Sequence, residues 1–148
     1  MIAVDSNLLI YAHRAAMPEH RLARATLDRL AASGAEWGFA QPSVAEFWSI
    51  VTHRTAAVPP SSPALARAFL RSLLADGRAQ LLLPGPGFGE RLIAAAERFE
   101  VNGPHIFDLQ IALIALEHGA TEIWSHDRNF VSLPGLPVHD PLPRARTR

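Results

Sequence analysis

The sequence predicts an α/β fold of three layers, α/β/α, in which helices cover both faces of a central, mainly parallel sheet of four to five strands. Short apolar runs alternate with helix-like segments of about ten or more residues, which is the pattern of βαβ units. Proline or glycine stands near many of the boundaries. The chain has 148 residues, of which 49% are hydrophobic and 19% charged, so we expect a single domain over residues 1–148.

The expected strands are short apolar runs bounded by polar or turn residues, and the expected helices repeat apolar residues at three- and four-residue spacing. In chain order they are a strand at 2–5, helices at 6–14 and 19–33, a strand at 37–40, helices at 42–54 and 64–75, a strand at 80–83, helices at 89–99 and 106–118, a strand at 122–125 and a short strand near Val138. Pro42 and Pro63 suit first helical turns, and Gly119 suits a helix end.

Four acidic residues stand just after predicted strands or near the starts of helices: Asp5, Glu46, Asp108 and Asp127. Open α/β sheets bind ligands at the carboxyl ends of their strands, so these side chains are the first candidates for a functional site. If they converge, raised pKa values or divalent cations must relieve their repulsion. Oxygen ligands and the absence of cysteine favour Mg²⁺ or Mn²⁺ over zinc, and a pair of such ions about 4 Å apart can drive in-line phosphodiester hydrolysis.

Each of these acids also has an ordinary structural explanation. Asp5 and Asp108 can cap helices, and Asp127 can be a turn residue in the segment HDRN. Glu46 points away from the apolar stripe of its helix and faces either solvent or a cleft. Asp108 belongs to a helix that is apolar nearly all round, where a carboxylate needs a compensating cation, hydrogen bonds or a proton. One shared site explains all four positions more economically than four separate caps.

Composition excludes several other classes of protein. The formal net charge is zero, so any contact with nucleic acid must be local rather than a broad basic surface. All fourteen basic residues are arginine, and the lack of lysine argues against receiver domains and P-loop hydrolases. The segment DSN at Asp5 lacks the second aspartate that phosphatases with an aspartate nucleophile carry. The chain has no cysteine, no signal-like start and no apolar run long enough for a membrane span, so we expect a cytoplasmic protein.

At the candidate acids the sequence resembles the PIN-domain family, and in particular the VapC-type toxin ribonucleases of bacterial toxin–antitoxin modules. The resemblance spans nearly the whole chain and is carried by DSNLLIYA from Asp5, PSVAEFW around Glu46, FDLQIALIALEHGA from Phe107 and IWSHDRNF from Ile123. It implies a PIN-like fold, and it implies catalytic and metal-binding roles for Asp5, Glu46, Asp108 and Asp127, with Asn7 and Ser125 as supporting polar groups. Serine at 125 replaces a frequent threonine, and Asn129 replaces a frequent aspartate, which puts a fifth acidic ligand in doubt.

The resemblance further implies a Mg²⁺- or Mn²⁺-dependent endoribonuclease that hydrolyses RNA phosphodiester bonds as the toxin of a type II toxin–antitoxin system. Its expected partners are RNA, a small cognate antitoxin that covers apolar surface and occupies the acidic cleft, and a second copy in a homodimer. His105, His126 and Arg128 lie beside the acids and are candidates for substrate contacts. Two alternatives stay open, namely a catalytically inactive PIN-like scaffold that binds a protein partner and an RNA-processing nuclease outside a toxin–antitoxin module.

Overall fold

A computed structural model describes residues 1–55, 58–75 and 78–142 of the chain. The described residues form one parallel sheet of five strands, as predicted, and the structure adds the strand order β3-β2-β1-β4-β5. The strands are β1 (Ile2–Val4), β2 (Trp37–Ala40), β3 (Gln80–Leu82), β4 (Glu122–Trp124) and β5 (Val138–His139). All predicted strands are present, and three of them end one residue earlier than expected because a residue at the end of the sheet leaves the strand pairing.

The six predicted helices are also present, with ends displaced by one or two residues. They are α1 (Ser6–His13), α2 (His20–Ala32), α3 (Gln41–Thr52), α4 (Pro63–Leu74), α5 (Phe88–Arg98) and α6 (His105–Glu117). Ser62 caps α4, because its hydroxyl accepts a hydrogen bond from the backbone N–H of Leu65 at 3.2 Å. None of the helices in the described part of the chain is long and apolar enough to cross a membrane.

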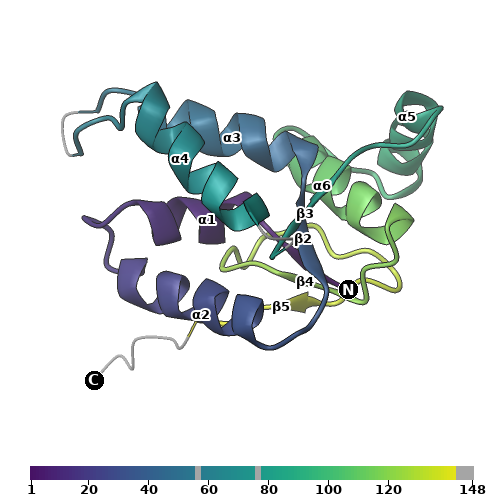
Figure 1. Ribbon diagram of the computed structural model, residues 1–148. Helices are drawn as coiled ribbons and strands as arrows, with labels where there is room; N and C mark the ends of the chain where they lie inside the picture. The colour runs from purple at the N-terminus through teal and green to yellow at the C-terminus, as the bar shows by residue number, and fades with distance from the viewer. Residues whose placement is uncertain (56–57, 76–77, 143–148) are drawn as a thin grey trace, which may run out of the picture.

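The sheet has a separate hydrophobic core on each face, because successive strand residues point to opposite sides. Val4, Trp37 and Phe39 pack against α1, α2, α3 and α4. Ala3 and Ile123 pack on the other face, mainly against α6. Figure 1 shows α1, α2 and α4 to one side of the strands and α5 and α6 to the other. This arrangement is the predicted three-layer α/β/α fold.

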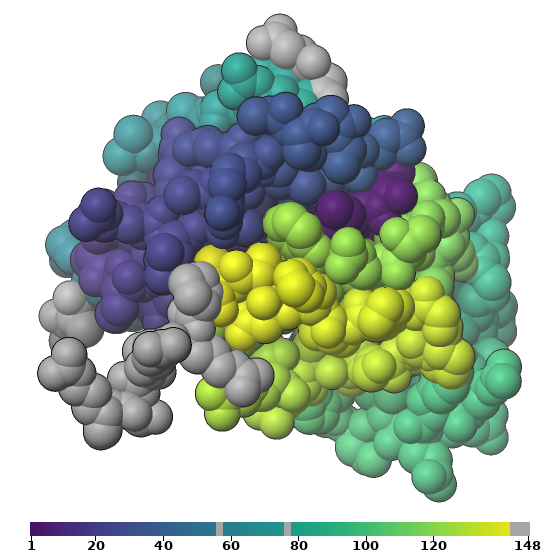
Figure 2. Space-filling view, turned by 90° about the horizontal axis from the view of Figure 1, so that it is seen from below, coloured from purple at the N-terminus to yellow at the C-terminus, as the bar shows by residue number. Residues whose placement is uncertain are grey.

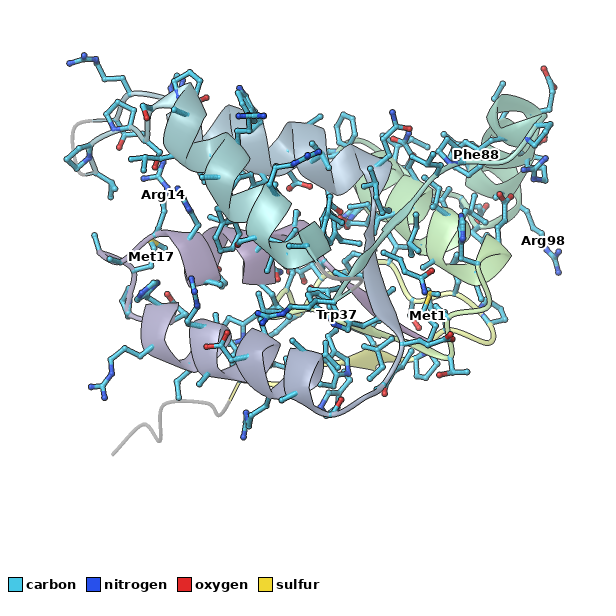
Figure 3. All side chains as sticks on the ribbon, in the orientation of Figure 1. Met1, Arg14, Met17, Trp37, Phe88 and Arg98 are labelled. Atoms are coloured by element: carbon cyan, nitrogen blue, oxygen red, sulfur yellow. The ribbon has the colours of Figure 1, made fainter. Side chains whose placement is uncertain are left out.

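Contacts far from the sheet fix the outer elements in place. Arg14 follows α1 and is buried, and its Nη2 donates a hydrogen bond of 2.6 Å to the carbonyl oxygen of Ile50 in α3 (Figure 3).

The segment that carries β5 covers the lower face of the molecule, where Figure 2 shows it in yellow beside α2. Leu133 and Leu136 in that segment pack against the α6 side, and Leu142 packs against the α2 side.

Candidate functional site

The candidate site lies at the carboxyl edge of the sheet, where three neighbouring parallel strands end together. β1 lies between β2 and β4, and Val4 pairs with Trp124, so the residues that follow these strands are adjacent. The chain leaves β1 toward β2 on one side, while β4 joins β1 from the other side. Ligands of open α/β sheets bind at this kind of topological switch point. Asp5 follows β1 directly, and Ser125 follows β4.

Asp5 is a buried carboxylate with only 5% of its surface exposed. Its Oδ1 accepts a hydrogen bond of 2.7 Å from the backbone N–H of Ser6 and thereby caps α1. Its Oδ2 accepts one of 2.7 Å from the hydroxyl of Ser125. Burial is the main cause that raises the pKa of Asp5 to about 6; the negative charge of Glu46 adds to the rise, and the hydrogen bonds from Ser125 and Ser6 oppose it. The cap predicted as an ordinary explanation is therefore present, but it leaves a destabilised carboxylate.

Glu46 faces the cleft, which settles the choice that helical periodicity left open. It lies on α3, and its Oε2 accepts a hydrogen bond of 2.7 Å from the hydroxyl of Ser6. The same hydroxyl oxygen is 3.2 Å from Oδ1 of Asp5. A hydroxyl has one proton, so the shorter contact to Glu46 takes it. Ser6 thus joins the two carboxylates.

Asp108 and Asp127 form a second pair of acids at the same edge. Asp108 is half-buried in the first turn of α6, and its Oδ2 lies 3.2 Å from Nδ1 of His105. Burial raises the pKa of Asp108, the contact with His105 lowers it, and the charge of Asp127 raises it. Asp127 is exposed, and its Oδ1 accepts a 2.8 Å hydrogen bond from the backbone N–H of Asn129, as the turn explanation predicts.

The polar groups expected to support the acids belong to one hydrogen-bond network with Asp5. The side-chain amide of Asn7 donates to the hydroxyl oxygen of Ser125 at 3.0 Å, and that oxygen also accepts from the backbone N–H of Asp127 at 3.1 Å. The side-chain carbonyl of Asn7 accepts from the backbone N–H of His126 at 3.3 Å. The network therefore ties the loop after β4 to the start of α1.

A cleft of about 690 Å³ opens beside these acids between α3 and α6. Glu46, Asp108 and Asp127 line it together with His105, whereas Ile50 and Phe107 are exposed apolar side chains on its walls. Asp5 is buried and does not line the cleft. Three of the four candidate acids therefore share one open cleft, and the fourth is connected to it through Ser6.

The acids approach one another in two pairs rather than as one closed cluster. In the described part of the chain, no three acidic or histidine side chains are arranged so that they could hold a metal ion as they stand. Like charges repel, and each carboxylate also has a local partner in a backbone N–H, a hydroxyl or an imidazole. The donor set nevertheless fits a hard cation, because it consists of oxygens and includes the buried Asp5, whose raised pKa a positive charge would lower. The metal-binding roles stay a prediction.

Sequence reasoning missed Ser6 and Asp140. Ser6 joins Asp5 and Glu46, and its signal was a hydroxyl directly after a strand-end aspartate. Asp140 follows β5, and its two carboxylate oxygens lie 2.9 and 3.0 Å from Nδ1 of His126. The position of Asp140 just after a predicted strand could have identified it. Of the three residues proposed for substrate contacts, His105 lines the cleft, His126 contacts Asp140, and Arg128 is exposed beside Asp127.

Comparison with known proteins identifies the family. The PIN-domain model matches residues 2–136. Ribonuclease VapC43 of Mycobacterium tuberculosis is 37% identical over 142 residues, which cover 96% of each chain. This chain belongs to the VapC ribonucleases of the PIN-domain family. Ribonuclease VapC33 of the same organism is 30% identical to this PIN domain over 96% of the present chain and 99% of its own.

Two solved structures share the fold of this PIN domain. VapC20 of Mycobacterium tuberculosis, described as a toxin that cleaves the sarcin–ricin loop, superposes with a TM-score of 0.66 at 17% identity and covers 88% of this chain and 92% of its own. VapBC2 of Rickettsia felis, solved with a DNA fragment from its promoter, superposes with a TM-score of 0.64 at 18% identity. The match covers 94% of this chain and 98% of the other chain. These likenesses confirm the predicted three-layer architecture.

Proposed function

We propose that this PIN domain is a metal-dependent endoribonuclease and the toxin of a type II toxin–antitoxin system, acting on RNA in the cytoplasm. Relatives named VapC ribonucleases, 37% identical to this chain, support the activity. The observation that carries the proposal is the Asp5 carboxylate, which is buried at the switch point of the sheet with its pKa raised to about 6 and with Glu46 beside it. Such an arrangement is costly unless a cation is meant to bind there.

Asp5, Glu46, Asp108 and Asp127 are the residues that would hold Mg²⁺ or Mn²⁺. When bound, the cation supplies a water of lowered pKa for attack on phosphorus and neutralises charge that develops on the phosphate oxygens. The chain prepares the ligands: Ser125 and the backbone N–H of Ser6 fix both oxygens of Asp5, and the Ser6 hydroxyl turns Glu46 toward the cleft.

The open cleft between α3 and α6 is where we place the RNA. Its volume of about 690 Å³ and its exposed mouth suit an unpaired stretch of a nucleic acid. His105 lines it and Arg128 is exposed beside Asp127, so both are placed to contact phosphate groups. Since the net charge of the chain is zero, these local contacts must do most of the binding.

The same cleft suits the proposed antitoxin. Ile50 and Phe107 are apolar side chains that line it with 42% and 60% of their surface exposed, and the carboxylates of Glu46, Asp108 and Asp127 line it too. A small protein could cover the two apolar side chains with apolar residues of its own, and it could pair an arginine with the carboxylates. Among the structural relatives, VapBC2 and FitAB were each solved as a complex on DNA. We also propose that this chain forms a homodimer, which sedimentation of the purified protein tests.

The decisive experiment is RNA cleavage by the purified chain with Mg²⁺ or Mn²⁺. We expect Asp5→Asn and Asp108→Asn each to lower the cleavage rate by at least about 100-fold, and EDTA to abolish it. Asp28→Asn is the matched control, because Asp28 is an exposed partner of Arg24 on α2 and should leave the rate unchanged. Equal rates in the parent and the two site variants would contradict the assignment.

A second pair of measurements separates the alternatives. A parent protein that cuts no RNA but binds a small protein would favour the inactive scaffold. An active enzyme whose induced expression leaves growth unaffected would favour an RNA-processing nuclease outside a toxin–antitoxin module. We expect growth arrest with the parent chain and none with Asp5→Asn.

A further inference from the structure

The His126 imidazole, next to Asp127 in the sequence, is held by several contacts. His126 follows Ser125 in the loop after β4, and its Nδ1 lies 2.9 and 3.0 Å from the two carboxylate oxygens of Asp140. The same carboxylate is itself held, because Oδ1 of Asp140 accepts a 3.0 Å hydrogen bond from the backbone N–H of Leu142. The pair therefore joins the loops that leave two neighbouring strands, β4 and β5.

Two further contacts fix the same ring. The backbone N–H of His126 donates to the side-chain carbonyl of Asn7, which belongs to the Asp5 network. The ring of Tyr11 meets the imidazole edge-on, with centroids 5.9 Å apart and planes at 81°. The His126 side chain is still 26% exposed. An imidazole with this many orienting partners and an open side is prepared to contact something outside the protein.

The free atom of that imidazole is Nε2. Because Nδ1 faces a carboxylate, a ring proton belongs on Nδ1, and the hydrogen bonds found in the described part of the chain leave Nε2 without a partner. His126 is directly between Ser125, which bonds Asp5, and Asp127, which lines the cleft. His126 thus belongs to the same loop as a side chain that lines the cleft, one residue away from it.

The proposed hydrolysis does not explain how the enzyme would distinguish RNA from DNA. Hydrolysis by an activated water does not use the ribose 2′-hydroxyl, so the acids by themselves do not distinguish RNA from DNA. Selectivity for RNA needs a separate contact with that hydroxyl. The 2′-hydroxyl is both a donor and an acceptor, so it can bond Nε2 in either charge state of the ring.

We propose that His126 contacts the 2′-hydroxyl of a nucleotide beside the scissile phosphate, and that Asp140 positions it, so that this pair makes the enzyme selective for RNA. The inference rests on the proposed ribonuclease function. A contact with phosphate instead, or a purely structural tie between the two loops, would affect RNA and DNA equally. The preference for ribose over deoxyribose is therefore the quantity that decides.

The test uses an RNA oligonucleotide whose cut position has first been mapped with the parent protein. Nucleotides on each side of the cut are then replaced singly by 2′-deoxynucleotides, and kcat/KM is measured for each substrate. We expect the parent to prefer ribose at one of these positions by about tenfold, which is the effect of one lost hydrogen bond to an oriented group. His126→Ala should lower kcat/KM for the all-ribose substrate by that factor, leave the deoxy substrate unchanged and so abolish the preference.

Asp140→Ala should reduce the preference in the same direction, and the double variant should behave as His126→Ala alone, because Asp140 acts through His126. His53→Ala is the matched control, since His53 is an exposed histidine at the end of α3 and should keep the full preference. If His126→Ala fails to fold cooperatively, His126→Leu keeps a side chain of similar volume without the nitrogen.

Each outcome has one meaning. Loss of the ribose preference with an unchanged rate on the deoxy substrate supports the inference. An equal loss on both substrates overturns it and leaves the proposed ribonuclease function standing. A parent protein that cleaves no RNA overturns both.

Discussion

Both oxygens of the Asp5 carboxylate accept hydrogen bonds, and each has a different partner. One oxygen caps α1 through the backbone N–H of Ser6, and the other accepts a hydrogen bond from Ser125. A carboxylate used only as a cap would lie at the surface, where its charge costs little. Here burial and the nearby Glu46 raise its pKa to about 6, so its charged form is disfavoured in the protein without a cation. The charged Asp5 carboxylate therefore lowers the stability of the folded protein at the proposed active site.

The cost should be measurable as a dependence of stability on pH. The folded pKa of about 6 lies above the ordinary value of 3.8, so between these values the folded state binds more protons than the unfolded state. The free energy of unfolding of the metal-free protein should therefore fall as the pH rises from about 4 to about 7. For Asp5 alone the fall should be on the order of 2–3 kcal/mol. Urea unfolding of the parent and Asp5→Asn in EDTA across this range measures it.

The pKa of Asp108 is also raised, so Asp108 contributes to the pH dependence of the parent protein. The contribution of Asp5 is therefore the difference in the free energy of unfolding between the parent and Asp5→Asn at each pH. Asp5→Asn should become more stable relative to the parent as the pH rises. Asp28→Asn, at an exposed helix position, should follow the parent at every pH. A difference between the parent and Asp5→Asn that does not change with pH would show that Asp5 is not the destabilised group.

Among the strands, β2 depends on a glycine for its place in the sheet. A Cβ added to Gly38 would lie 2.4 Å from the carbonyl oxygen of Gln80 on β3 and 3.0 Å from a methyl carbon of Leu82. Such a contact with backbone cannot be relieved by a side-chain rotation. β2 leads directly into α3, which carries Glu46, so the close approach of β2 and β3 also helps to place one wall of the cleft.

We expect Gly38→Ala to destabilise the protein by about 1–3 kcal/mol, because the two strands must separate to admit the methyl group. Gly89→Ala is the matched control, since Gly89 lies in α5 and its added Cβ would meet nothing within 4 Å. That change should be neutral or stabilise by up to about 1 kcal/mol. Thermal or urea unfolding of both variants checks the pair, and equal stabilities would refute the role given to Gly38.

Considered as one assembly, the site takes its acids from distant parts of the chain. Asp5 comes from the end of β1, Glu46 from α3, Asp108 from α6 and Asp127 from the loop after β4. Two hydrophobic cores hold these elements around one sheet edge, while the acids themselves repel. A cation bound among them would add a further connection between elements that packing and the hydrogen bonds of Ser6, Asn7 and Ser125 already join.

Mg²⁺ or Mn²⁺ should therefore raise the melting temperature of the whole chain. A cation that binds only the folded state adds about 2.7 kcal/mol at 100 times its Kd, which corresponds to a shift of roughly 9 °C for a chain of this size. Differential scanning calorimetry with and without the cation measures the shift, and excess EDTA should reverse it. Asp108→Asn should abolish most of it, whereas Asp28→Asn should keep it. An undiminished shift in Asp108→Asn would place the cation elsewhere.

Much of the fold was predictable because local patterns and the fold agree. Apolar runs and helical spacing place every strand and helix within one or two residues, including the short last strand near Val138. The helix starts at Pro42 and Pro63 followed from the fixed backbone angle of proline. Three strands end one residue earlier than predicted, and Asp5 and Ser125, the residues that follow two of them, belong to the site.

The candidate acids could be named from strand ends, but their relations to one another could not. Helical spacing left Glu46 facing solvent or a cleft, and only the Ser6 hydroxyl, brought across from α1, decides between them. Asp140 contacts His126 because β5 pairs with β4, which brings the residues that follow the two strands together. Such contacts join residues far apart in the chain, and no local pattern encodes them.

The amino-acid order alone established a parallel sheet between two helical layers and the identity of the acids at its edge, because period and residue type are local properties. The folded chain decided that Asp5 is buried, that the acids lie in two pairs, and that the His126 imidazole contacts Asp140 while staying partly exposed. Burial, distance and charge coupling depend on which distant segments pack together. These are the quantities that set pKa values and binding, so the chemistry of the site becomes definite only after the chain has folded.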